Sequence, residues 1–93
     1  MLLALDVGNT NLTFGVFDEK DTSSQYVPRA TWRISTETSR MADEYGMLFS
    51  HLLPDKGVSV DDLTGIVLCS VVPPLTSIFV EVCKKHLKVD PMV

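Results

Sequence analysis

Cysteine is scarce in this chain, and no long apolar run is present. The two cysteines among 93 residues, Cys69 and Cys83, are too few and too far apart for a disulfide framework or a zinc site. Cys69 lies in an apolar run and Cys83 in a helical pattern, so we expect two buried free thiols, as in a reducing cytoplasm. No apolar run reaches the ~18 residues of a membrane span, and the amino terminus lacks the layout of a signal peptide. We therefore expect a cytoplasmic protein.

The chain also has fewer basic residues (8 Lys and Arg) than acidic ones (12 Asp and Glu). The formal net charge is −4 and the pI is about 4.9, which argues against wholesale binding to nucleic acid or to an anionic membrane. One basic cluster (Lys84, Lys85, His86 and Lys88) lies at the end of a predicted helix, where it complements the helix dipole. A chain of 93 residues with 45% apolar residues is expected to form one small globular domain.

The chain begins with a polar turn between two apolar segments. An apolar run over Leu2–Val7 and an alternating run over Leu12–Asp18 flank a Gly/Asn turn, which predicts a β-hairpin. The turn region combines the Asp6 carboxylate with a glycine, two threonine hydroxyls and two asparagines, which tolerate unusual φ and ψ angles. Backbone N–H groups in such a turn can bind an anion, and Asp6 can hold Mg²⁺ or its water shell. These groups suit the binding of a phosphate together with Mg²⁺.

The same residue types also occur in tight turns that bind nothing. Asn, Asp, Gly and Thr are the usual turn residues, so the hexapeptide 6–11 by itself is a structural turn more often than a phosphate loop. Both interpretations stay open on these residues alone, and the rest of the chain has to supply the context.

Three strands are predicted before the first helix. Residues 19–27 are polar and without periodicity, which predicts an exposed loop. Arg29–Ser35 alternates, with Trp32 on the core side and Arg33 on the solvated side, and predicts a third strand with one wet face. The connections are short, so the three strands are expected to form an antiparallel meander.

Helices and strands alternate in the second half. Thr36–Ser39 offers N-caps for a helix that Pro54 ends. Ile66–Val72 suits a strand buried on both faces, and Pro73-Pro74 ends it. A second helix runs to Leu87, and an extended segment begins at Val89. The apolar stripes of the two helices are Met41, Tyr45, Leu48, Phe49 and Leu52 in the first, and Leu75, Ile78, Phe79, Val82 and Leu87 in the second.

Other polar residues have structural interpretations. Asp43 and Glu44 are neighbours in a first helical turn, so we interpret them as a solvated helix start and not as paired catalytic carboxylates. His51 is interpreted as a surface or helix-capping residue, not a ligand. For Ser70–Pro74, a strand end and a segment that lines a site are equally compatible with the sequence.

The predicted order β-β-β-α-β-α-β, with a mixed sheet, is the plan of an α/β, ribonuclease-H-like (actin-like ATPase) half. Four motifs, in order, also closely resemble the amino-terminal part of the type III pantothenate kinase family, in the acetate and sugar kinase/Hsp70/actin superfamily. They are Asp-Val-Gly-Asn-Thr-Asn at 6–11, Ala-Thr-Trp-Arg-Ile-Ser-Thr at 30–36, Ala-Asp-Glu-Tyr at 42–45 and Ser-Val-Val-Pro-Pro at 70–74.

The resemblance implies ATP-dependent phosphorylation of pantothenate to 4'-phosphopantothenate, the first step of coenzyme A biosynthesis. It also implies Mg²⁺, a monovalent cation (K⁺ or NH₄⁺), a cytoplasmic homodimer, and no nucleic-acid or membrane partner. Asp6 would hold Mg²⁺ through the phosphate and its water shell. The implied ATP-binding residues are Asp6, Val7, Gly8, Asn9, Thr10, Asn11, Leu12 and Thr13.

The chain departs from the family in what it lacks. Members of the family carry a later Gly-x-Asp-Arg motif whose aspartate is the catalytic base, and no Asp-Arg pair occurs here. We therefore expect residues 1–93 to be the amino-terminal half-domain of a longer two-domain kinase. The base is expected beyond Val93, and the 93-residue chain alone is expected to be inactive.

Three other functions compete with this one. Some members of the family were labelled Bvg accessory factors, so one alternative is a transcriptional regulator, against which the acidic balance counts. A second alternative is a non-catalytic nucleotide-binding module. A third is a sugar or acetate kinase relative, because the Asp-x-Gly-x-Thr hairpin is shared across the superfamily. The 32–36 and 70–74 segments favour the pantothenate branch.

Overall fold

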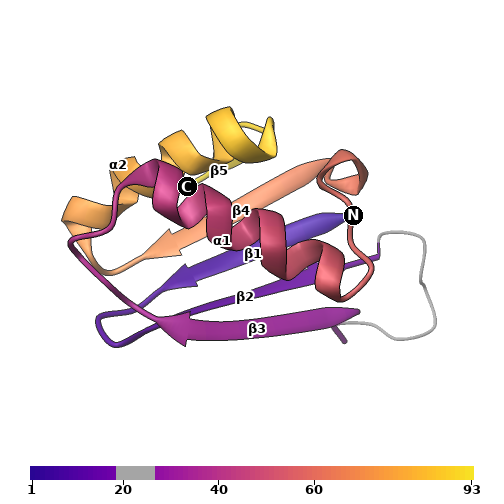
Figure 1. The fold of residues 1–93 in the computed structure, drawn as a ribbon, viewed down its shortest axis with the longest axis horizontal. Helices are drawn as coiled ribbons and strands as arrows, with labels where there is room; N and C mark the ends of the chain where they lie inside the picture. The colour runs from indigo at the N-terminus through magenta and orange to yellow at the C-terminus, as the bar shows by residue number, and fades with distance from the viewer. Residues whose placement is uncertain (19–26) are drawn as a thin grey trace.

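The structure is a computed structural model that describes residues 1–18 and 27–93. Its strands form one mixed sheet in the order β3-β2-β1-β4-β5 (Figure 1). The strands are β1 (Leu2–Val7), β2 (Asn11–Phe17), β3 (Ala30–Ser35), β4 (Gly65–Ser70) and β5 (Pro91–Met92). The helices are α1 (Ala42–Asp55), the short 3₁₀ helix η1 (Val60–Asp62), α2 (Pro73–Val82) and its π-helical continuation η2 (Cys83–Leu87).

Strand β1 lies at the junction of two kinds of pairing. It pairs antiparallel with β2, and β2 pairs antiparallel with β3, which is the predicted meander. On its other side β1 pairs parallel with β4, and β4 pairs parallel with β5. Parallel neighbours need crossover connections, and α2 with η2 supplies the one between β4 and β5. The predicted α/β, ribonuclease-H-like element order is confirmed.

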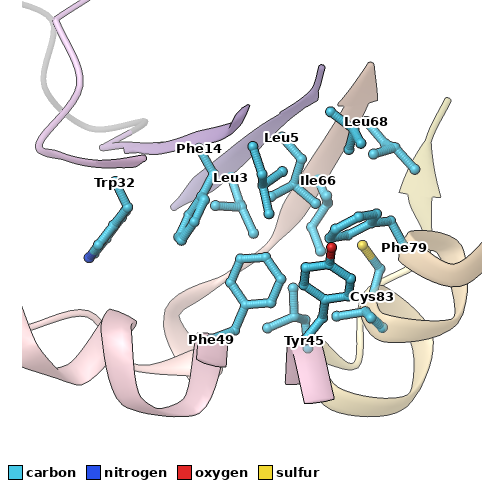
Figure 2. Packing of buried hydrophobic residues seen from close by; sticks show 14 of the residues in the cluster. Leu3, Leu5, Phe14, Trp32, Tyr45, Phe49, Ile66, Leu68, Phe79 and Cys83 are labelled. Carbon is cyan, nitrogen blue, oxygen red and sulfur yellow. The ribbon is translucent and has the colours of Figure 1, made fainter. Parts of the chain in front are cut away.

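Helices α1 and α2 cover the same face of the sheet (Figure 1). The alternation of β1 sends Leu3, Leu5 and Val7 toward them, and all three are buried. Figure 2 shows the aromatic part of this core: Phe14 lies 4.7 Å from Phe49 of α1, centroid to centroid, while Tyr45 lies 4.6 Å from Phe79 of α2. One face of the sheet is therefore the core, and the other face is open and carries exposed residues such as Asp6 and Val67.

Strand β4 corrects two expectations. It is buried on one face, not on both, because the described helices cover a single side of the sheet: Ile66 and Leu68 are buried, whereas Val67 is 40% exposed. Cys69 points to the same side as Val67 and is exposed, so the expectation of a buried thiol is wrong there. Cys83 is buried as expected, and burial raises the pKa of its thiol to about 12.

Helix α1 differs from the prediction in its N-cap residue, in its carboxyl-terminal end and in part of its buried face. Its N-cap is Met41, whose N–H donates to the Glu44 carboxylate at 2.9 Å, so Thr36–Ser39 does not cap it. Pro54 lies inside its last turn, because a proline near the end of a helix removes one intrahelical hydrogen bond without ending the helix there. Of the predicted stripe, Tyr45 and Phe49 are buried, Leu48 and Leu52 are half-buried against the core, and Met41 is exposed. Ala42, Gly46 and Leu53 complete the buried face.

The strand predicted over Ile66–Val72 ends at Ser70, and Val72 is the N-cap of α2. Other expectations for the elements hold where the structure describes them. Trp32 is buried and Arg33 is exposed on β3. Pro73 and Pro74 occupy the first positions of α2, and the helical segment ends at Leu87, with Lys88 in the left-handed region. The loop expected over 19–27 lies, apart from Val27, outside the described residues. In the two described ranges, no helix is long and apolar enough to cross a membrane.

Candidate phosphate-binding hairpin

The turn between β1 and β2 is a tight one. The N–H of Gly8 donates to the Asn11 carbonyl at 3.0 Å, just beyond the Val7–Leu12 pair that ends the ladder. A Cβ on Gly8 would lie 3.0 Å from that same carbonyl oxygen, so a larger residue would require the backbone of the turn to shift slightly. Among the described non-glycine residues, positive φ occurs at Lys88 alone, so Asn9 and Asn11 do not use the unusual angles that asparagine tolerates.

The eight predicted ATP-binding residues fall into two groups. Asp6, Asn9, Thr10 and Thr13 are exposed, and Gly8 and Asn11 are half-buried. Val7 and Leu12 have side chains that are fully buried in the core under the helices. The side chains of those two residues hold the hairpin against the core, and only their backbones can face a ligand.

The tip of the hairpin offers backbone donors. In the part of the chain that the structure describes, the N–H groups of Asn9 and Thr10 make no hydrogen bond to the protein. The N–H of Gly8, by contrast, is already engaged by Asn11 and is not available to a ligand. Two successive free amides at an exposed turn suit an anion, with the neighbouring hydroxyls as further donors.

A row of side chains crosses the open face of the sheet next to this turn. Asp6 of β1 is in register with Thr13 of β2 on one side and with Cys69 of β4 on the other. Thr13 is in turn in register with Arg33 of β3. Paired positions put their side chains on one face, and all four residues are exposed. The row thus holds a carboxylate, a hydroxyl, a thiol and a guanidinium, at the edge of an apolar recess of about 430 Å³.

Two other loops end at the same edge of the sheet as the hairpin (Figure 1). After β4, the N–H of Val71 donates to the carbonyl of Val7 at 3.0 Å, and the Ser70 hydroxyl accepts from the N–H of Val72. Ser70 therefore shapes the turn that ends β4, and that turn is fastened to the end of β1. In α/β sheets, ligands commonly bind at the carboxyl ends of the strands, where this edge lies.

The third loop, after β3, reveals a residue that sequence reasoning missed. Thr36 donates its Oγ1–H to the carbonyl of Gly8 at 2.7 Å and its backbone N–H to the carbonyl of Thr10 at 2.9 Å. The sequence suggested Thr36 as a helix cap, whereas it holds the hairpin turn. Arg33 was likewise interpreted as a solvated strand residue, and only its register with Thr13 in the folded sheet links it to the Asp6 row.

The donor set around Asp6 fits Mg²⁺ held largely by water and phosphate. Asp6 is exposed, and the described residues contain no cluster of three His, Cys, Asp or Glu side chains. Mg²⁺ keeps several waters and is bound through one or two carboxylates plus substrate phosphates, not through an all-protein cage. A single exposed carboxylate beside a turn with two successive free amides meets that requirement.

A comparison with protein families decides the assignment. The sequence profile of type III pantothenate kinase matches residues 2–93, which is the whole chain apart from its first residue. The chain belongs to the type III pantothenate kinase family. It is therefore a member of a kinase family, and a kinase family implies the use of ATP. The matched range includes the hairpin, the Thr36 segment and the β4–α2 turn.

Proposed function

We propose that this chain supplies the ATP-phosphate site of a pantothenate kinase, which transfers the γ-phosphoryl group of ATP to the hydroxyl of pantothenate. The observation that carries the proposal is the Asp6 hairpin: a carboxylate next to two unengaged backbone amides, at the carboxyl edge of the sheet of a chain in this family. Phosphoryl transfer depends on positioning and on charge neutralisation, and these groups supply both.

In this proposal each group of the hairpin has a separate task. The amides of Asn9 and Thr10 hold phosphate oxygens, and the side chains of Asn9, Thr10 and Thr13 add further donors. Asp6 holds Mg²⁺ through water, and the ion, when bound, neutralises charge that develops on the phosphates. The described part of the open row beside Asp6 contains no further carboxylate or histidine that could act as the base.

The proposal includes a larger protein. We infer that residues 1–93 form the amino-terminal half of a two-domain kinase, whose other half carries the catalytic base. Its activation by K⁺ or NH₄⁺, its homodimeric state and its cytoplasmic location are parts of the same proposal. An acidic net charge of −4 supports the view that its ligands are small molecules and not nucleic acid.

The first test measures the reaction. The full gene product, with ATP and Mg²⁺, is assayed for ADP release by a coupled assay with and without pantothenate. ADP release that depends on pantothenate is the expected result. ADP release with acetate or a sugar instead would favour the wider superfamily. Salt-resistant, sequence-specific DNA binding without any turnover would favour the regulator.

The second test addresses Asp6. In the full gene product, Asp6→Asn should lower kcat/KM for ATP by about 100-fold or more, because an amide cannot replace the carboxylate toward Mg²⁺. Asp55→Asn, a matched change of an exposed carboxylate at the end of α1, should leave kcat/KM unchanged. An Asp6→Asn variant with the wild-type rate and Mg²⁺ dependence would show that Asp6 is a turn residue and nothing more.

A further inference from the structure

Thr36 is the one described residue outside the hairpin that makes hydrogen bonds to the hairpin turn itself. It lies 28 positions beyond Gly8 in the sequence, directly after the last residue of β3. Its side chain and its backbone both act as donors, and their acceptors, the carbonyls of Gly8 and Thr10, lie on the two sides of Asn9. Thr36 thus donates hydrogen bonds to two carbonyl groups of the turn.

The position of the two acceptors has a consequence for the amides of the turn. No peptide bond in the described residues is cis, and in a trans peptide the C=O of one residue and the N–H of the next point in opposite directions. A Gly8 carbonyl held by Thr36 therefore directs the N–H of Asn9 away from Thr36. The Thr10 carbonyl does the same for the N–H of Asn11. The two bonds therefore set the directions of the Asn9 and Asn11 N–H groups.

Thr36 is itself held in place by the core. The next residue, Glu37, is bonded twice to the Tyr45 hydroxyl: its N–H donates at 3.1 Å, and its carbonyl accepts from the hydroxyl at 2.7 Å. Tyr45 is a fully buried residue of α1, and its ring packs on Phe79 of α2 (Figure 2). A rigid helix therefore fixes residue 37, residue 37 fixes the place of Thr36, and Thr36 fixes the turn.

We propose that Thr36 is a positioning residue for the phosphates of ATP, acting through the Gly8 carbonyl to preorient the Asn9 amide. This inference rests on the proposed function, since it assigns the task of the hairpin to phosphate binding. Thr36 does not cap α1, whose N-cap is Met41, so capping does not account for its hydroxyl. Preorganised amides bind a ligand without the cost of ordering the turn at the moment of binding.

The experiment uses three variants of the full gene product. Thr36→Val removes the Oγ1–H but keeps the shape and the backbone N–H, so it breaks the bond to Gly8 alone. Thr36→Ser keeps the hydroxyl and should restore the bond. Thr38→Val makes the same change at an exposed threonine two positions away. Circular dichroism and thermal unfolding establish that each variant is folded.

The readout is the Kd of ATP with Mg²⁺, measured by calorimetry without pantothenate, and the KM of each substrate. Thr36→Val should raise the Kd and the KM of ATP about tenfold, the cost of one lost hydrogen bond and a misdirected amide, and should leave the KM of pantothenate unchanged. Thr36→Ser and Thr38→Val should match the wild type. A folded Thr36→Val variant with wild-type ATP affinity, or with equal losses for both substrates, would overturn the proposal.

The two proposals fail in different ways. A wild-type protein that binds ATP but does not phosphorylate pantothenate overturns the proposed reaction, and the ATP affinity of Thr36→Val still decides the role of Thr36. A wild-type protein that phosphorylates pantothenate, with a Thr36→Val variant of unchanged affinity, overturns the role of Thr36 alone. A wild-type protein without any affinity for ATP overturns both.

Discussion

A histidine ring from the end of the second helix lies against the backbone of Gly46 in α1. A Cβ on Gly46 would come within 2.5 Å of Cδ2 of His86, closer than any van der Waals contact allows. The same ring places Nε2 at 2.9 Å from the Asp43 carboxylate, one turn earlier on α1. A glycine inside a helix, at a fully packed position, is thus explained by the close approach of η2.

Gly46→Ala should therefore lower the free energy of unfolding by about 1–3 kcal/mol, because the ring of His86 has to move. Helix propensity alone predicts the opposite, a gain of up to about 1 kcal/mol. Urea unfolding followed by circular dichroism measures the change. Adding His86→Ala to Gly46→Ala should remove most of the loss, and Met47→Ala, at an exposed position of the same helix, serves as the control. A stabilised Gly46→Ala variant would contradict this account.

Asp43 makes the stability of the two-helix contact depend on pH. Hydrogen bonds from Lys85 and His86, and the charge of Lys85, hold the pKa of the Asp43 carboxyl below its usual value of ~3.9. The same contact raises the pKa of Lys85. A carboxylate with a depressed folded-state pKa contributes stability above its unfolded pKa and loses it as the pH falls through the folded value.

Asp43→Asn should thus destabilise the protein slightly at pH 7, and the difference from the wild type should shrink as the pH falls below about 4. The effect is small because both partners are exposed and screened by solvent and salt. Urea unfolding from pH 7 to pH 3 measures it, with Asp61→Asn as an exposed control. A difference that grows toward low pH would contradict the assignment.

At the scale of elements, the indole of Trp32 links β3 to the end of α1. Nε1 of Trp32 donates to the carbonyl of Leu52 at 3.1 Å, which satisfies an acceptor in the last turn of α1. The Trp32 ring also stacks on Phe14 of the neighbouring strand, 5.0 Å between centroids. Lys56, just after α1, lies over the same ring and donates to the carbonyl of Thr31. The Trp32 side chain therefore contacts both the last turn of α1 and Phe14 of β2.

Trp32→Phe should keep the stack but remove the donor to Leu52, at a cost of about 1–3 kcal/mol in the free energy of unfolding. Circular dichroism is the appropriate probe in urea, since the variant removes the sole tryptophan of the sequence. Ile34→Val, on the same strand and partly buried, is the control for a packing change and should cost less. Equal losses in the two variants would show that the hydrogen bond contributes little.

At the scale of the whole molecule, the two faces of the sheet are unequal. The described helices lie on one face, and the other exposes Val67 and Met92 beside the Asp6 row. Exposed apolar sheet faces and open edges favour association between chains. Residues 1–93 produced alone should therefore form oligomers, and the proposed two-domain organisation predicts that they lack pantothenate kinase activity, because positioning by the proposed second half would be absent.

Sedimentation velocity measures that association. Lysine substitutions of two exposed valines test whether the open face causes it. Val67→Lys places a charge on the open face and should shift the distribution toward monomer. Val71→Lys changes a still more exposed valine, in the turn after β4 and off the open face, and should not. A monomeric wild-type chain, or an equal response to the two lysines, would show that the open face does not drive association. Kinase turnover by 1–93 alone would contradict the expected position of the base.

The sequence by itself determined the elements of this protein and the place of its candidate site. Alternation and helical spacing are local properties, so they were enough to predict the three-stranded meander, both helices and the hairpin at Asp6. The four ordered motifs were enough to point to the family. The cap of α1 was mispredicted, and Met41 of the predicted stripe is exposed. The other stripe residues, Tyr45, Leu48, Phe49 and Leu52, lie in or against the core as predicted.

Only the tertiary structure decided which residues lie next to one another at the candidate site. Arg33, Thr13, Asp6 and Cys69 form one row because of strand register, which periodicity within a single strand does not specify. Cys69 is exposed because the described helices cover one face of β4, and a run of apolar residues looks the same whether one face or two are buried. Thr36 holds the turn across 28 positions, since a hydrogen bond between distant segments exists only once the sheet has brought them together.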